Sequence, residues 1–132
     1  MQRVKLFINE AKGLYGIKDE TGKVIVIPVF RSEKNARRYL KEMEWVLIDD
    51  DLKRRQNDLV FTIKSKVEDF KAAEGAAPNS ILVSELCYNT LDVCELVQVG
   101  VFNGVEAESL MGMKLEVDRG NWSQRISVGI LR

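Results

Sequence analysis

The stretch from Pro78 to Asp118 constrains the fold of this chain more than any other. It carries an apolar run, a helical pattern that Ser84 opens as an N-cap, a second apolar run and a final alternating segment. The segment CELVQVGVF, residues 94–102, fits either a strand or an extension of the helix. From this stretch we predict strands over 80–83 and 114–118, a helix from 84 to 91, and a short helix over 105–111 that Gly112 ends.

The N-terminal part of the chain predicts a small sheet. Residues 2–8 alternate polar and apolar side chains, which is typical of a strand. The tetrapeptide DETG, residues 19–22, separates two further apolar segments at 14–18 and 23–30, and its glycine accommodates a positive φ angle. These two segments therefore predict a β-hairpin. A last strand is expected at the C-terminus, over 124–131, where Ile126, Val128 and Ile130 share one face.

The second arm of the hairpin contains VIVIPVF, residues 24–30, which is apolar on both faces. Such a run predicts a strand inside the sheet, with Pro28 at its end or at an edge because proline cannot donate to a ladder. Ser32 is then a candidate N-cap for a helix over 33–43. The apolar stripe of this helix consists of Ala36, Tyr39, Leu40 and Met43, and a short strand is expected over 45–48.

The longest periodic segment predicts a central helix over 52–74, which would be roughly 33 Å long at the standard rise per residue. Three carboxylates, Asp49 to Asp51, precede it and suit the positive end of the helix dipole. The segment GAAPN, residues 75–79, ends it and is the best internal boundary. The predicted buried stripe consists of Leu52, Leu59, Ile63, Val67 and Phe70.

Strands and helices interleave without a strict βαβ rhythm, so we predict an α+β (mixed α/β) fold. It combines an N-terminal hairpin or sheet with a helix, a long central helix, and a C-terminal strand-helix-strand unit. At 132 residues the chain has the size of a single domain, 1–132. A subdivision into 1–74 and 78–132 is the alternative.

The composition argues against an enzyme. The chain has no histidine and two cysteines, and it lacks a Walker loop, G-x-G-x-x-G, G-x-S-x-G and C-x-x-C. Cys87 and Cys94 are expected to be free thiols, because a helix separates their α-carbons by roughly 10 Å. We therefore predict no catalytic residue, no metal and no cofactor.

Two groups of acidic residues are candidate chemical sites. Asp49 to Asp51 are adjacent and point in different directions, so helix capping is favoured over a cation site. Glu116 and Asp118 share a strand face and are able to pair with Glu106 or Glu108. No histidine, lysine or phosphate loop stands beside them in sequence, so a structural role is favoured for them too.

The distribution of charge along the chain suggests binding to partners rather than catalysis. The formal net charge is zero, but residues 1–77 hold 16 Lys/Arg and 13 Asp/Glu, whereas residues 78–132 hold four and seven. This polarity is compatible with self-association. The helix over 33–43 presents a basic stripe that is either a solvated face or a contact for phosphates. Its members are Lys34, Arg37, Arg38 and Lys41.

Trp122 follows Arg119-Gly120-Asn121 in a polar turn, where a large aromatic either folds back onto the domain or is offered to a partner. We name Trp122 and Arg119 as candidate partner-binding residues beside the basic stripe. The other aromatic side chains are expected in the core, namely Phe7, Phe30, Tyr39, Trp45, Phe61, Phe70 and Tyr88.

Two segments resemble known families. GLYGIKDETGKVIVIPVF, residues 13–30, looks like one unit of the WG-type repeat, with Tyr15-Gly16, Asp19 to Gly22 and Ile27-Pro28 in the repeat positions. Residues 78–118 are similar to a pattern in small tailed-phage structural and assembly proteins. That pattern is carried by Ile81 to Ser84, Tyr88, Leu91, Met111-Gly112 and Glu116 to Asp118. The resemblance implies a phage origin and a role in the virion or its assembly.

Together these features predict a non-enzymatic protein-interaction protein, a phage structural or assembly component that forms a homo-oligomer. The alternatives are a small phage-type regulator that binds and inhibits a host protein, and an accessory protein that contacts nucleic acid. No apolar run approaches the roughly 20 residues that span a bilayer, and the N-terminus lacks a signal-peptide pattern. We therefore expect no membrane partner and a location in the host cytoplasm or the virion.

Overall fold

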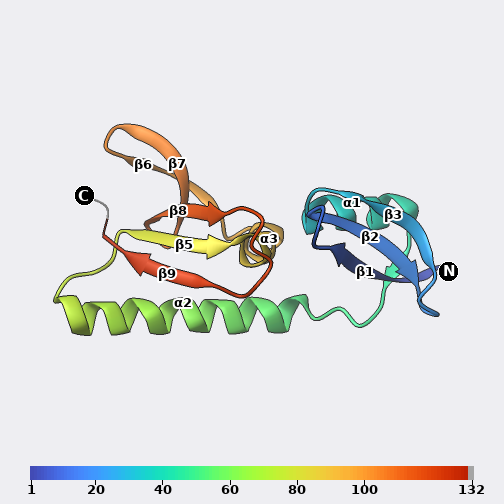
Figure 1. Cartoon of the computed structure of the whole chain (residues 1–132), viewed down its shortest axis with the longest axis horizontal. Coiled ribbons are helices and arrows are strands. Elements are labelled where there is room, and N and C mark those ends of the chain that lie inside the picture. The colour runs from blue at the N-terminus through green and yellow to red at the C-terminus, as the bar shows by residue number, and fades with distance from the viewer. Residues whose placement is uncertain (131–132) are drawn as a thin grey trace. The chain divides into compact units, whose positions relative to one another are not determined.

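The computed structural model describes residues 1–130 and has an α+β fold, as predicted (Figure 1). The described residues form nine strands in two sheets and three helices. Contacts divide the chain into two compact units, residues 1–52 and residues 53–132. The division falls at Leu52, the first residue of the long helix. The long helix therefore groups with the C-terminal sheet.

The N-terminal unit contains one four-stranded sheet with the strand order β3-β2-β1-β4. Neighbouring strands run antiparallel, except that β4 lies parallel to β1. One helix, α1 (Glu33–Met43), connects β3 to β4. The strands are β1 (Arg3–Asn9), β2 (Leu14–Asp19), β3 (Val24–Phe30) and β4 (Val46–Leu47).

Local sequence explains both the predicted hairpin and α1. In the β2–β3 turn the Asp19 carboxylate accepts hydrogen bonds from the backbone N–H groups of Thr21 (2.9 Å) and Lys23 (3.0 Å), and Gly22 takes a φ of 94°. At the start of α1 the Ser32 hydroxyl accepts from the Asn35 N–H at 3.1 Å. The predicted hairpin, the helix over 33–43 and its N-cap are all confirmed.

The core of this unit lies between the sheet and α1. Val4 and Ile17 are fully buried, and Leu40 joins them from the helix. Tyr39 packs edge-on against Trp45 with ring centroids 5.6 Å apart, and Phe30 lies 5.2 Å from Tyr39. Three of the aromatic residues predicted in the core are therefore packed there.

One prediction for this sheet is wrong. The run VIVIPVF forms β3, which is an edge strand rather than an interior one. The side chains of Ile27 and Val29 are 69% and 51% exposed. Pro28 does lie on an edge, as its missing N–H requires. The apolar run alone could not reveal the edge position of β3, because the sequence of one strand does not say which strands pair beside it.

The C-terminal unit contains a five-stranded mixed sheet with the strand order β6-β7-β8-β5-β9 (Figure 1). The central strand β5 pairs parallel with β8 and antiparallel with β9. The strands are β5 (Ser80–Ser84), β6 (Gln98–Phe102), β7 (Val105–Leu110), β8 (Met113–Asp118) and β9 (Ile126–Gly129), and the helices are α2 (Leu52–Glu74) and α3 (Glu85–Val93).

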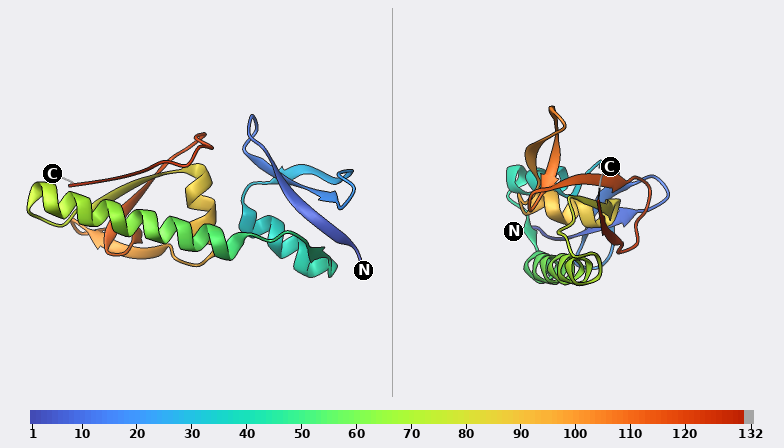
Figure 2. Two further views of the ribbon diagram at one scale, coloured as in Figure 1. Left: turned by 90° about the horizontal axis from the view of Figure 1, so that it is seen from below. Right: turned by 90° about the vertical axis from the view of Figure 1, so that its left-hand side faces the viewer.

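The long helix α2 runs beside this sheet (Figure 2). Ile63 is fully buried, and Leu59 and Val67 pack against the same core. These three positions follow the predicted stripe, with spacings of four residues. The core also contains Ile81 and Val83 of β5, Leu91 of α3 and Leu115 of β8. None of the helices in the described part of the chain is both long and apolar enough to cross a membrane.

The segment 105–111 was predicted as a short helix, and this is wrong because residues 105–110 form β7. The cause is the turn before it. Asn103 and Gly104 both have positive φ angles, 53° and 78°, which suits a two-residue hairpin loop. This loop pairs β7 with β6 in the register Val101↔Glu106. The ambiguous segment 94–102 is thereby resolved as a strand at its C-terminal end.

The strands predicted over 80–83 and 114–118 are confirmed as β5 and β8, and two further strand predictions are confirmed with shorter bounds. The strand expected over 45–48 covers Val46–Leu47, and the last strand covers Ile126–Gly129. Ile126 and Val128 contact the core as predicted. Ile130 is 47% exposed, and residue 131 lies outside the described residues.

Candidate interaction surfaces

The basic stripe of α1 keeps three of its four predicted members at the surface. Lys34, Arg38 and Lys41 are exposed. Arg37 instead turns toward carboxylates of its own unit. Its Nε donates to Glu33 at 2.9 Å, and its two terminal nitrogens donate to Asp50 at 3.0 and 2.7 Å. The hydrogen bond to Asp50 is the main cause of a raised pKa for Arg37. Arg37 therefore has a structural role.

The Arg119–Trp122 turn is held by contacts within its own unit. The Arg119 guanidinium lies over the Tyr88 ring, 5.1 Å from its centroid, and approaches the Glu85 carboxylate at 4.0 Å. The same carboxylate accepts a hydrogen bond from the Gly120 N–H at 2.8 Å. Trp122 is half-buried. The structure thus shows Trp122 folded partly back, and it places Arg119 and Trp122 in a different unit from α1.

The acidic groups make individual contacts rather than a shared site. Asp49 pairs with Lys5 at 3.0 Å, whereas Asp50 pairs with Arg37 and also accepts from the Leu52 N–H at 3.1 Å. Glu108 accepts from the Tyr88 hydroxyl at 2.9 Å. Within residues 1–130 no group of three or more acidic or cysteine side chains is arranged to hold a metal ion.

Neither Cys87 nor Cys94 forms a disulfide within the described residues, as predicted. Cys87 is buried at 4% exposure in the core of the C-terminal unit, and Cys94 is half-buried. Ser84 caps α3 by accepting from the Cys87 N–H at 3.3 Å. The position of Cys87 is therefore explained by packing.

The most exposed apolar side chains of the C-terminal sheet lie on the β6–β7 hairpin, and sequence reasoning missed them. Val99 and Val101 of β6 are 71% and 68% exposed, and Val105 at the start of β7 is 65% exposed. β6 is an edge strand. The alternation V-x-V beside an Asn-Gly turn was the available signal, because it marks a hairpin arm. We call Val99, Val101 and the free edge of β6 the valine edge.

Phe61 is a second departure from the predicted core. It lies on α2 with 73% of its surface exposed, two residues from the fully buried Ile63. Two residues correspond to about 200° around a helix, so Phe61 and Ile63 point in opposite directions. The helical period was itself sufficient to assign Phe61 to the outer face.

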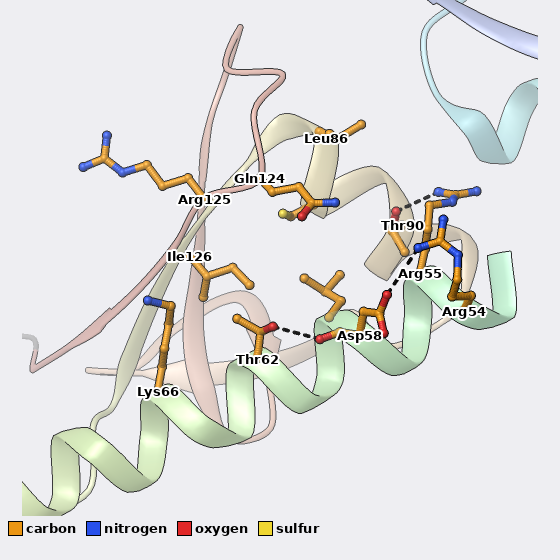
Figure 3. Close-up of a pocket in the computed structure, with 12 residues that line it drawn as sticks. Arg54, Arg55, Asp58, Thr62, Lys66, Leu86, Thr90, Gln124, Arg125 and Ile126 are labelled. Atoms are coloured by element: carbon orange, nitrogen blue, oxygen red, sulfur yellow. Dashed lines mark hydrogen bonds and ion pairs between the residues drawn. The ribbon is translucent and has the colours of Figure 1, made fainter. Parts of the chain in front are cut away.

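A groove of about 310 Å³ opens within the C-terminal unit between α2, α3 and the start of β9 (Figure 3). Its apolar lining comes from all three elements: Leu59, Leu86, Cys87 and Ile126. Its polar lining is mostly cationic and hydroxylic, with one carboxylate: Arg54, Arg55, Asp58, Thr62, Lys66, Thr90, Gln124 and Arg125. Sequence reasoning did not assemble this group, because its members are up to 72 residues apart along the chain.

The fold and these surfaces define an α+β protein of two small sheets with an exposed apolar strand edge and a cationic groove. Comparison of the chain with protein-family models, with curated proteins and with solved structures found no match in any of the three.

Proposed function

We propose that this chain is a non-enzymatic protein-interaction protein that self-associates through the valine edge as a phage structural or assembly component. The observation that carries the proposal is the high exposure of Val99 and Val101 on an unpaired strand edge. The phage assignment rests on the resemblance of residues 78–118, and it implies action in the host cytoplasm or in the virion.

An exposed edge strand is a template for strand addition, because its outward N–H and C=O groups have no partner in the sheet. Natural edges are usually protected by charged residues or proline. The edge strand β3 has such protection in Pro28, whereas β6, with the sequence QVGVF, contains neither proline nor a charged residue. The valine edge is therefore the better candidate for self-pairing.

Strand addition would also cover apolar surface. Burying an exposed valine side chain completely contributes roughly 1.5 to 3 kcal/mol. Two copies meeting at β6 bring four such valines together. This gain is large enough to offset part of the cost of association, which is of order 4 to 15 kcal/mol. The main-chain hydrogen bonds of the added strand supply more.

The test is the native mass of the purified protein over a concentration series, by light scattering or sedimentation. We expect a discrete oligomer for the wild type and a monomer for the double variant V99K/V101K, because lysines on the edge repel an incoming copy. I27K is the matched control: it places lysine at an equally exposed apolar position on the proline-protected edge strand. It should keep the wild-type mass.

A wild-type protein that is monomeric at every concentration would refute self-association. The same edge is then free for a foreign strand, as the host-regulator alternative requires. Capture of one host protein by the wild type and by I27K, but not by V99K/V101K, would support that alternative. Loss of the oligomer in I27K but not in V99K/V101K would refute the valine edge.

The nucleic-acid alternative is favoured by one observation. Lys34, Arg38 and Lys41 recur at i, i+4 and i+7 along α1 and are all exposed, and in the described structure none of them forms an ion pair. A low-salt mobility-shift assay of the wild type against K34Q/R38Q/K41Q decides this point. Binding that falls steeply with salt and disappears in the triple variant would support it. The absence of any shift would refute it.

A further inference from the structure

We propose that the groove between α2, α3 and β9 binds a small organic anion that has an apolar body. This site is independent of the proposed function, because none of its lining residues belongs to the valine edge. The volume of about 310 Å³ is at the lower end of the range for small-molecule sites. The ligand chemistry follows from how the lining is arranged.

The inner part of the groove is apolar and built from the core. Ile126 and Cys87 are 8% and 4% exposed, and both also belong to the hydrophobic core of this unit. Leu59 of α2 and Leu86 of α3 complete the apolar lining. These side chains come from three packed elements, so the floor exists before a ligand arrives. It suits an aliphatic or aromatic group.

Cationic groups lie at both ends of this floor. Of the six α2 residues that line the groove, four recur at the spacing i, i+4, i+7 and i+11, which keeps them on one helix face: Arg55, Leu59, Thr62 and Lys66. The rise per residue separates the α-carbons of Arg55 and Lys66 by about 16 Å. Figure 3 shows Arg55 reaching toward Thr90 at one end and Lys66 extending beside the groove at the other.

The carboxylate in the lining does not neutralise the groove. Asp58 pairs with Arg54 at 3.3 Å, and Arg55 donates to the Thr90 hydroxyl at 2.9 Å. Lys66 makes no hydrogen bond or ion pair within the described part of the chain. The Arg125 side chain points away from the groove in Figure 3. The lining therefore holds more cationic than anionic side chains, and no ion pair within the described residues offsets the charge of Lys66.

The probes are a matched set: sodium octanoate, 1-octanol and sodium acetate. Octanoate combines a carboxylate with an apolar chain, octanol keeps the chain alone, and acetate keeps the charge alone. Binding is measured by calorimetry and by amide shift changes in the full chain at low salt. We expect octanoate to bind at least tenfold more tightly than the other two, with the changed amides in α2, α3 and the start of β9.

Two variants locate the site. K66Q removes the cation of Lys66 and should weaken octanoate binding about three- to tenfold. The loss of one hydrogen bond to a charged group lowers affinity by about tenfold. T62W fills the groove from an exposed position and should abolish binding. Their controls on the same helix, K64Q and S65W, replace exposed residues that do not line the groove. Both controls should bind as the wild type does.

Three results would overturn the proposal. Octanoate binding no tighter than octanol binding would show that charge is not recognised. Equal binding by T62W and the wild type would place the ligand elsewhere. No detectable octanoate binding at millimolar concentration would show that the groove takes no such anion. Each result leaves the native mass and the valine edge unaffected, so the two proposals fail separately.

Discussion

The Arg37 guanidinium binds the Asp50 carboxylate through two parallel hydrogen bonds of 3.0 and 2.7 Å. A third bond, from the Arg37 Nε to Glu33 at 2.9 Å, continues the network along α1. Such bidentate pairs are among the stronger side-chain interactions in proteins. The pair ties the segment after β4 to the helix, and it removes one cation from the predicted basic stripe.

Asp50→Asn should destabilise the N-terminal unit by about 1 to 2 kcal/mol, because it replaces a charged acceptor with a neutral amide beside Arg37, whose side chain is only 21% exposed. Urea unfolding followed by Trp45 fluorescence in a Trp122→Phe background measures the change. Arg38→Gln is the control. Arg38 is exposed on the same helix, so its replacement should alter the free energy of unfolding by less than about 0.5 kcal/mol.

Gly16→Ala should destabilise the same sheet by about 1 to 3 kcal/mol. A β-carbon at Gly16 would lie 2.6 Å from Cζ of Phe7 and 3.0 Å from the backbone oxygen of Val26. Phe7 stands directly opposite Gly16 in the β1–β2 register. Thermal unfolding measures the effect, with Gly129→Ala as the strand-glycine control, since its added carbon would meet only Ser80 at 3.6 Å.

The double variant F7A/G16A tests whether the Gly16→Ala substitution is destabilising because its methyl group collides with the Phe7 ring, or because β1 and β2 tolerate no substitution at these positions. If the clash with the ring is the cause, the added methyl group should cost less in the Phe7→Ala background than in the wild type. If Gly16→Ala lowers the free energy of unfolding equally in both backgrounds, the Phe7 ring is not the cause and the Val26 carbonyl is the obstacle.

Asp19 should titrate below its ordinary value. Its pKa is lowered mainly by the Thr21 hydroxyl, which donates at 2.6 Å, and then by the Lys23 N–H at 3.0 Å. A lowered pKa means that the turn stabilises the ionised form. This contribution is present above the unfolded pKa of about 3.9 and is lost as the pH falls through the folded value.

Carboxyl NMR of the wild type and Thr21→Val tests this account of the turn. Valine keeps the branched shape but lacks the hydroxyl, so the pKa of Asp19 should move up toward its ordinary value. An unchanged pKa would show that the backbone donors alone hold the carboxylate.

Tyr88 should resist ionisation at alkaline pH. Its pKa is raised mainly by burial and then by the hydrogen bond to Glu108, which also repels a phenolate. A raised pKa stabilises the fold below about pH 10, the ordinary tyrosine value, and this contribution is lost as the pH rises further. The difference in absorbance near 295 nm between the wild type and Tyr88→Phe isolates this group.

Glu108→Gln separates the two causes of that shift. It removes the negative charge but keeps a hydrogen-bond acceptor, so the pKa of Tyr88 should fall below the wild-type value while remaining raised by burial. A pKa that does not change would assign the whole shift to burial.

Local patterns were reliable where a short segment decides its own structure. The Ser32 cap, the stripe Leu59, Ile63 and Val67, and the DETG turn each depend on residues within a few positions, and each was confirmed. The helix predicted over 105–111 failed because the loop at Asn103 and Gly104 makes pairing with β6 available. A paired strand satisfies the backbone groups of this segment without helical bonds.

The sequence by itself determined the α+β class, the long helix and the absence of familiar catalytic motifs, because periodicity and composition act locally. Only the tertiary structure decided which strands are edges. Both β3 and β6 are edge strands, and the local sequences VIVIPVF and QVGVF do not say which strands pair beside them. The groove likewise depends on tertiary structure, since Thr90 and Ile126 are far from the Arg55–Lys66 face of α2 in sequence and line the same groove only in the folded unit.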